Sequence, residues 1–401
     1  MRARFFYWGV LWLWGGGLLP VLAAPGPLSN TATVSLLTVA PGAETYALFG
    51  HSALRVTDPR RGLDQVYNFG TFDFDTPHFY WRFLRGDLRY FLSVTPFAAF
   101  KAAYQREQRP LTEQVLALRP SEAQRLYDRL ESTLHSPAKY YRYQFFADNC
   151  TTRLAELVRA GVEEPLAMDS AYAPASRTYR QLLAPYLAPA PWVNLGMNLG
   201  LGWPADRPAT FRQRLFLPTE LQQAFAHTRR QHRPFVAFTR PLLAPRPPRP
   251  EAAGKGPTPT GLFVGLWLLV LGAGRLPARY AFLGRRLRQG LFVAVGATGC
   301  VLLGLQVASL HTPAHANYQL LWLLPTHVRL AFARPSRRWR RYATVSLALL
   351  ALGALFGYGV FYAQIIPEVG WLLSLLFFEL LMFVRHPLGP STLLRPALNT
   401  G

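Results

Sequence analysis

The chain has 401 residues; half are hydrophobic and 16% are charged, below the ~25% typical of soluble chains. This composition excludes a disordered chain and a single ordinary soluble domain. The net charge is +22, yet only three of the 43 basic residues are lysine. Because the arginines are scattered or flank apolar runs, we predict no binding to nucleic acid.

The N-terminus has the layout of a secretory signal peptide, which we place at residues 1–24. Arg2 and Arg4 precede an apolar run, Phe5–Leu22, and Ala23-Ala24-Pro25 supplies small residues for cleavage. An uncleaved membrane anchor is the alternative. In either case the sequence that follows is exported.

Residues 25–240 mix polar and apolar positions, as expected of an exported α+β domain. The runs Ala32–Val39, Ser52–Thr57 and Gln65–Phe74 are rich in strand-favouring residues. Helices are expected later, at Thr112–Leu116 and Ser121–Leu134. Strands and helices are therefore partly segregated along the chain.

A proline-rich linker over residues 241–259 separates this domain from a membrane domain at 260–386. A cytoplasmic tail is predicted to follow at 387–401. A spanning helix needs ~20 apolar residues. The five predicted spans are Leu262–Gly274, Leu291–Leu310, Leu320–Phe332, Ala343–Ile366 and Trp371–Val384.

The charges between these segments alternate. The first and third connections carry five arginines each, whereas the connections at His311–Gln319 and Pro367–Gly370 carry no basic residue. Basic loops stay in the cytoplasm, so the alternation predicts that all five segments cross the inner membrane. It also places the α+β domain in the periplasm. Glu379, the one acidic residue inside a span, is a candidate functional group.

The chain has two cysteines, Cys150 and Cys300. Cys300 lies in an apolar run and Cys150 in a polar stretch, so we expect no disulfide between them. Asp148-Asn149 precedes Cys150, and a helical pattern follows it. A thiol at a helix N-terminus has a lowered pKa and is a candidate nucleophile.

A thiolate nucleophile needs an imidazole partner. Of the histidines in the exported domain, His51 is the best candidate, because it follows Gly50 at the start of a predicted strand that would hold its ring rigidly. His311 and His315 lie four residues apart outside the membrane, but a third ligand is missing. We therefore predict no metal and no cofactor.

Several motifs together resemble one family. They are Gly50-His51-Ser52-Ala53-Leu54-Arg55, Tyr67-Asn68-Phe69-Gly70-Thr71-Phe72 and Asn149-Cys150-Thr151, followed by the region His311 to Pro325. In this order the motifs resemble the Lnb N-terminal periplasmic domain and the membrane domain of Lnb-like proteins. The resemblance implies a papain-like thiol domain, similar to the permuted NlpC/P60 group, followed by an all-α bundle of five transmembrane helices.

The resemblance also implies residue roles. Cys150 would be the nucleophile, His51 the base and Asn68 the group that orients the imidazole, with Asp73 as its rival. Five further residues of these motifs are expected at the substrate: Arg55, Tyr67, Asn149, His311 and Asn317.

Lnb-like proteins are associated with lipoprotein N-acylation, which implies a phospholipid acyl donor and a lipoprotein acceptor at the inner membrane. Two alternatives remain. One is a periplasmic thiol hydrolase that cuts peptidoglycan peptides or lipid esters, and the other is a membrane scaffold without catalysis. Aromatic residues over Phe69–Phe91 favour an apolar slot facing the bilayer, although they are equally consistent with a core cluster.

Overall fold

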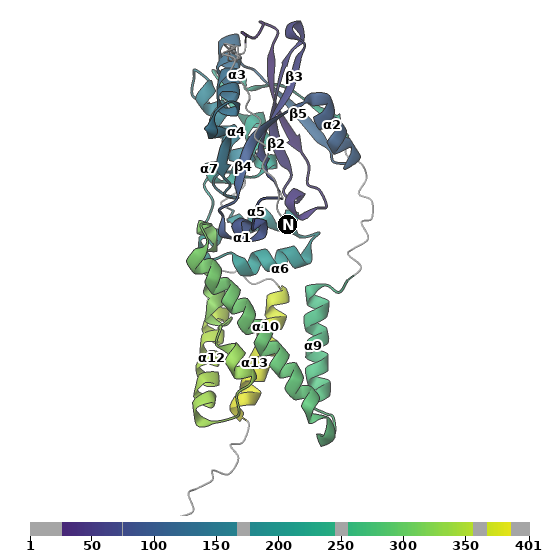
Figure 1. Cartoon of the computed structure of the whole chain (residues 1–401), viewed down its shortest axis with the longest axis vertical. Coiled ribbons are helices and arrows are strands. Elements are labelled where there is room, and N and C mark those ends of the chain that lie inside the picture. The colour runs from purple at the N-terminus through teal and green to yellow at the C-terminus, as the bar shows by residue number, and fades with distance from the viewer. Residues whose placement is uncertain (1–25, 74, 167–176, 245–255, 356–366, 386–401) are drawn as a thin grey trace, which may run out of the picture.

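The computed structural model describes residues 26–73, 75–166, 177–244, 256–355 and 367–385. The predicted signal peptide and cytoplasmic tail lie outside the described residues. A domain built on a β-sheet forms one end of the molecule, and helices between Pro259 and Arg385 form the other (Figure 1). The predicted order of an α+β domain and a helical region is confirmed, whereas the likeness to papain stays a prediction.

The sheet is antiparallel, with the strand order β6-β4-β3-β2-β1-β5-β9. The first three strands confirm the predicted strand runs. A separate two-stranded ribbon pairs β7 (Arg229–Arg230) with β8 (Arg233–Pro234). The seven strands are β1 (Thr33–Val39), β2 (His51–Asp58), β3 (Leu63–Thr71), β4 (Arg89–Pro96), β5 (Leu111–Leu116), β6 (Tyr140–Arg142) and β9 (Val236–Leu243).

The helix predicted over Thr112–Leu116 is wrong, because these residues form strand β5. The segment is short, and β1 and β9 pair with it on its two sides. Non-local pairing of this kind overrides the helical preference of Glu113 and Gln114. Its partner β9 runs through Leu243, so the first residues of the predicted linker belong to the sheet.

Helices cover both faces of the sheet. The helices α3 (Pro120–Leu134), α4 (Cys150–Gly161) and α8 (Pro218–His227) pack on one face, over strand residues such as Leu54. On the other face α2 (Phe97–Arg106) packs Phe100 against Ala53 and Val66. Consecutive strand residues point to opposite faces, so the two cores alternate along β2 and β3.

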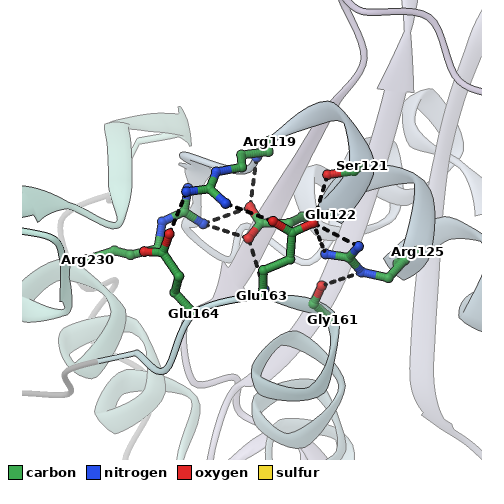
Figure 2. A network of polar contacts seen from close by, with 8 residues as sticks. All are labelled: Arg119, Ser121, Glu122, Arg125, Gly161, Glu163, Glu164 and Arg230. Carbon is green, nitrogen blue, oxygen red and sulfur yellow. Dashed lines mark hydrogen bonds and ion pairs between the residues drawn. The ribbon is translucent and has the colours of Figure 1, made fainter.

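An ionic network fixes the far end of α4 to the start of α3 (Figure 2). The buried Glu122 accepts hydrogen bonds from the N–H groups of Arg119 and Glu163 and from the Arg230 guanidinium. Arg125 donates to the carbonyl of Gly161, the last residue of α4. The network therefore anchors the helix whose opposite end carries Cys150.

The helical region contains α9 (Pro259–Ala273), α10 (Ala281–Ala308), α11 (His327–Ala331), α12 (Arg337–Leu355) and α13 (Pro367–Arg385). Two helices in the described ranges, Ala278–Ala308 and Pro367–Arg385, are long and apolar enough to cross a membrane, and α9 is shorter. The number of crossings therefore stays a prediction.

The third predicted span, Leu320–Phe332, is wrong as a continuous helix. A 3₁₀ turn, Tyr318–Leu321, leads to Pro325, and the short α11 follows. Proline interrupts a helix because it has no N–H and its ring collides with the preceding turn. Neighbouring glycines give the broken segment room: a Cβ on Gly299 would lie 2.1 Å from the carbonyl oxygen of Leu323.

The two regions are docked through α1 (Phe79–Arg85) and α6 (Pro191–Gly200); α6 lies across the end of the helical region (Figure 1). The Leu310 N–H donates to the Arg85 carbonyl at 2.7 Å. The Gly202 N–H donates to the Pro313 carbonyl at 2.7 Å. The domain is thus held by the loop that follows the long helix α10. The remaining helices are α5 (Tyr179–Leu187) and α7 (Phe211–Arg214).

Candidate functional site

Cys150 is the first residue of α4, and Asn149 caps the helix. The Asn149 Oδ1 atom accepts hydrogen bonds from the N–H groups of Thr151 and Thr152, and the Arg153 N–H donates to the Asn149 carbonyl. These bonds do not use the N–H of Cys150, which lies next to its own thiol. A helix N-terminus stabilises negative charge at this point.

His51 begins β2 and lies against Asn68 of β3, with 2.6 Å between His51 Nε2 and Asn68 Oδ1. An amide oxygen only accepts hydrogen bonds, so Nε2 carries the proton and Nδ1 is the acceptor nitrogen. Gly50 precedes His51 with φ of +79°, and a Cβ there would lie 2.6 Å from the Val39 carbonyl oxygen. Only glycine fits the turn that delivers His51 to the sheet.

The partners of His51 are fixed by an irregularity in β3. The pairing of β3 with β4 shifts between Asn68 and Thr71, and Gly70 lies within this bulge with φ of +104°. Asn68 Nδ2 donates to Thr71 Oγ1, which is itself hydrogen-bonded to Ser93 Oγ at 2.6 Å. The bulge and this chain of bonds orient Asn68 toward His51.

The surroundings of Cys150 favour the thiolate. Burial raises the pKa of the thiol. The charge of His51 and a hydrogen bond to its ring lower this pKa, as do hydrogen bonds with Thr151 and the Ser52 N–H, and together they outweigh the effect of burial. The resulting pKa is about 7. The Cys150 thiol is therefore about half ionised at neutral pH, the state that acts as a nucleophile.

The substitution Gly70→Ala is expected to lower Cys150 reactivity at pH 7 about tenfold or more. An added Cβ would lie 3.4 Å from Cys150 Cβ and 3.6 Å from His51 Cε1, in a backbone conformation that costs about 1–3 kcal/mol for other residues. Alkylation by iodoacetamide, read by mass spectrometry, measures the effect. Gly62→Ala is the matched control, since Gly62 also has positive φ but its Cβ would meet open space. Equal losses in both variants would contradict this assignment.

A cavity of about 180 Å³ opens beside the imidazole. His51, Asn68 and Gly70 line one side of it, together with residues from the end of α2 and the loop after it. The rest of its wall comes from Tyr46, Ala47, Gly50 and Phe72. His51 and Ala53 are two residues apart on β2, and Asn68 and Val66 are two apart on β3, so His51 and Asn68 point to the face of the sheet that α2 covers.

A larger cavity, about 670 Å³, lies along α4. Cys150 lines neither cavity, but His51 and Gly70 line only the smaller one, and a Cβ on Gly70 would lie 3.4 Å from Cys150 Cβ. We therefore assign the chemistry to the smaller one.

Three of the residues predicted at the substrate have their side chains bound within the fold. Arg55 is buried and forms ion pairs with Asp64 and Glu113. The hydroxyl of the buried Tyr67 donates to Glu131, and Asn149 caps α4 as described above. We give these three residues structural roles, and Asn149 positions Cys150.

His311 and Asn317 connect the two regions of the molecule. Burial lowers the pKa of His311, so the ring is neutral and its Nε2–H donates to the Phe83 carbonyl of α1 at 3.2 Å. Asn317 Nδ2 donates to the carbonyls of Leu199 and Gly200 at the end of α6. Both predicted substrate residues therefore take part in docking.

The other candidates lie apart from the thiol. Asp73 accepts the N–H of Asp75 within a turn, so Asn68 and not Asp73 is the residue against His51. Glu379 is buried and forms an ion pair with Arg288, at 2.6 Å. The part of the chain that the structure describes contains no group of three metal-ligating side chains.

Sequence reasoning missed the contributions of Gly70 and the cavity residues Tyr104 and Arg109. A glycine inside a strand pattern is a known signal for a bulge, so Gly70 could have been found. The other two approach the site only through the packing of α2 on the sheet, for which the sequence gives no signal.

Comparison with known families gives two matches. The family model of the Lnb N-terminal periplasmic domain matches residues 28–184. The model of the Lnb transmembrane domain matches residues 251–386. No curated protein and no solved structure matches the chain.

Proposed function

The chain belongs to the Lnb family, and we propose that it is a membrane-bound thiol acyltransferase that moves an acyl chain from a phospholipid to a lipoprotein amine. The observation that carries the proposal is the arrangement of Cys150, His51 and Asn68 in a periplasmic domain docked onto a transmembrane domain.

In the first step the Cys150 thiolate attacks an ester carbonyl of the phospholipid. The N–H of Cys150, at the helix N-terminus, is the backbone donor that we assign to the oxyanion. The carbon–oxygen bond breaks, the protonated His51 ring gives its proton to the departing alkoxide, and a lysophospholipid leaves. The acyl chain remains on Cys150 as a thioester.

In the second step the terminal amine of the lipoprotein attacks the thioester. The His51 ring, now neutral, accepts the proton that the amine loses, and the thiolate of Cys150 departs. The product is an amide, and the protein returns to its starting state. Asn68 holds the ring so that the same nitrogen serves both steps.

Exposed aromatic and apolar residues support access from a bilayer. Trp81, Phe83 and Leu84 of α1 are each about half exposed, on the helix that contacts the loop after α10. The first residue of α1, Phe79, contacts Phe72, which lines the cavity beside His51. A lipid chain bound at α1 would therefore lie close to the cavity, because Phe79 of α1 contacts the cavity residue Phe72.

We also propose that the chain crosses the membrane five times, with the broken segment as the third crossing. Irregular backbone is tolerated at membrane depth only where protein buries it. Trp322, Leu323 and Leu330 of this segment are each at most 2% exposed. With five crossings, both arginine-rich connections would lie on the cytoplasmic side of the membrane, as the positive-inside rule predicts.

The test is the intact mass of the purified full chain after incubation with phospholipid vesicles. We expect a gain of one acyl chain that hydroxylamine removes, since thioesters are cleaved by this reagent. Cys150→Ala should show no gain. Cys300→Ala is the matched control, because it removes the other thiol, exposed on α10, and should acylate normally.

Release of free fatty acid without an adduct would instead favour the hydrolase. An adduct that persists in Cys150→Ala, or absence of turnover with any lipid, would contradict the proposal. Added lipoprotein peptide with a free terminal amine should discharge the adduct and form the amide.

A further inference from the structure

The cavity beside His51 has a second polar wall that the proposed mechanism leaves unused. Tyr104 of α2 and the following residues Glu107 and Arg109 form it. These residues face the side of the sheet on which His51 and Asn68 lie. A group that fills the cavity would therefore contact both this wall and the imidazole.

Arg109 is only 7% exposed, and its position is fixed. Its Nε donates to the Ala40 carbonyl at 2.9 Å and its Nη1 to Glu107 at 3.0 Å. A Cβ on Gly42 would come within 3.0 Å of the Arg109 side chain, so Gly42 leaves the space that the arginine occupies. The ring of Tyr104 lies 5.0 Å from the guanidinium carbon.

The remaining nitrogen, Arg109 Nη2, is buried and has no hydrogen-bond partner within the described residues. A buried charged donor without an acceptor is destabilising, because it has lost its bonds to water and gained none in return. Native structures rarely keep such a group unless a ligand or water supplies the acceptor. Arg109 lines the cavity, so a small shift of its side chain would bring Nη2 to an anionic oxygen bound there. The planar guanidinium suits phosphate oxygens in particular.

Glu107 adds the opposite charge to the same wall. Its carboxylate is 46% exposed and is held by Arg109, so one face remains open to a cation. A ligand that joins an anion to a cation a few bonds apart matches this pair, whereas a plain anion meets repulsion from Glu107. The cavity volume of about 180 Å³ is below the ~300–1,000 Å³ of pockets that enclose drug-sized ligands. The size suits a polar headgroup rather than an acyl chain.

We propose that this cavity is the headgroup subsite for a zwitterionic phospholipid. The phosphodiester binds Arg109, and the ammonium group binds Glu107. The adjacent glycerol ester is thereby presented to Cys150. The inference rests on the proposed function, since it names the class of donor for the same thiol.

Binding of headgroups without acyl chains tests this subsite apart from catalysis. The parent is full-length Cys150→Ala in detergent, and the probes are glycerophosphoethanolamine, glycerophosphoglycerol and inorganic phosphate, measured by calorimetry. We expect glycerophosphoethanolamine to bind about tenfold more tightly than the other two. Glu107→Gln should remove this preference, and Arg109→Gln should weaken both headgroups about tenfold.

Controls separate binding from folding. Arg106→Gln alters the exposed arginine that ends α2, three residues before Arg109, and should bind like the parent. Because Arg109→Gln removes structural bonds as well, thermal unfolding is followed for each variant, and Arg109→Lys tests whether a cation alone suffices. A lysine that restores charge but not the forked geometry should recover part of the affinity.

Equal binding of the three probes, or variants that all bind like the parent, would overturn the proposal. Inorganic phosphate that binds as tightly as glycerophosphoethanolamine would indicate a site for free phosphate and would also overturn it. The acylation experiment distinguishes the two proposals. Binding with the expected variant pattern but without a thioester refutes only the acyltransferase, whereas thioester formation without headgroup preference refutes only the subsite.

Discussion

Replacement of His51 by alanine is expected to slow alkylation of Cys150 at pH 7 about fiftyfold. The charge and hydrogen bond of His51 are the main causes that bring the Cys150 pKa down to about 7. Without them burial is opposed only by the bonds from Thr151 and the Ser52 N–H, and we expect the pKa to return to about its ordinary value of 9.0. At pH 7 the thiolate fraction then falls from about one half to about one in a hundred.

The measurement is the rate of iodoacetamide alkylation between pH 5 and pH 10, on a Cys300→Ala background so that a single thiol is counted. The rate should rise with pH in both proteins, with its midpoint near 7 in the parent and at least two pH units higher in His51→Ala. An unchanged midpoint would rule out the ion pair.

Two further variants test whether Asn68 or Asp73 orients the His51 ring. Asn68→Ala removes the oxygen that orients His51 and should shift the midpoint upward by less than His51→Ala does. Asp73→Asn should leave the profile unchanged, because Asp73 accepts a backbone N–H within its own turn. A larger effect from Asp73→Asn than from Asn68→Ala would reverse the assignment.

The candidate pair, Cys150 and His51, could be proposed from sequence because local signals mark both residues. Asn149 before a helical pattern indicates an N-cap, and Gly50 before a strand indicates a tight approach. What the sequence does not encode locally is the distance between Cys150 and His51, 99 positions apart in the chain. The pairing is therefore inferred from the position of His51 after Gly50 and from the roles that the family resemblance implies.

The errors arise where a partner far away in the chain decides the structure. Strand β5 has a mixed local preference, and pairing with β1 and β9 makes it a strand. The segment around Pro325 is apolar enough to be read as a span, but it lies against glycines of α10 and α12 as broken backbone. In both cases the sequence pattern correctly indicates that the segment is buried, but it predicts the wrong backbone conformation.

The same limit explains why Arg55, Tyr67 and Asn149 were expected at the substrate. Polar residues inside motifs suggest function, yet a buried polar side chain equally marks a satisfied structural bond. Arg55 lies between two carboxylates, and Tyr67 donates to Glu131. Arg109 shows the reverse case, since its place in the cavity wall and its buried Nη2, which has no hydrogen-bond partner among the described residues, become visible only in the folded protein.

Replacement of Arg180 by methionine is expected to cost about 3–5 kcal/mol in the free energy of unfolding. Arg180 and Asp206 form an ion pair at 2.9 Å, and their side chains are 5% and 2% exposed. Arg180 also donates to the carbonyls of Asn198 and Leu201. Removing one member of a buried pair leaves the other charge in a medium that solvates it poorly.

Denaturant unfolding of the full chain in mild detergent, followed by tryptophan fluorescence, measures this change. The matched control is Arg159→Met, whose ion pair with Glu156 is exposed by 53% and 48%, so it should cost at most about 1 kcal/mol. The double variant Arg180→Met with Asp206→Leu should recover part of the lost free energy of unfolding, since it also removes the carboxylate that Arg180 neutralised. Equal costs for the two methionine variants would contradict the argument.

The position of this pair makes its loss a test of docking as well. Arg180 joins α5 to the end of α6 and to the turn Trp203–Asp206, whose neighbour Gly202 donates to the Pro313 carbonyl of the membrane domain. If Arg180 holds this connection, Arg180→Met should lower the rate of Cys150 acylation from vesicles while leaving alkylation by the water-soluble iodoacetamide unchanged. Loss of both would place the damage in the thiol site itself. Loss of acylation alone would mean that the thiol is intact and that its delivery to the lipid depends on the docked arrangement of the two domains.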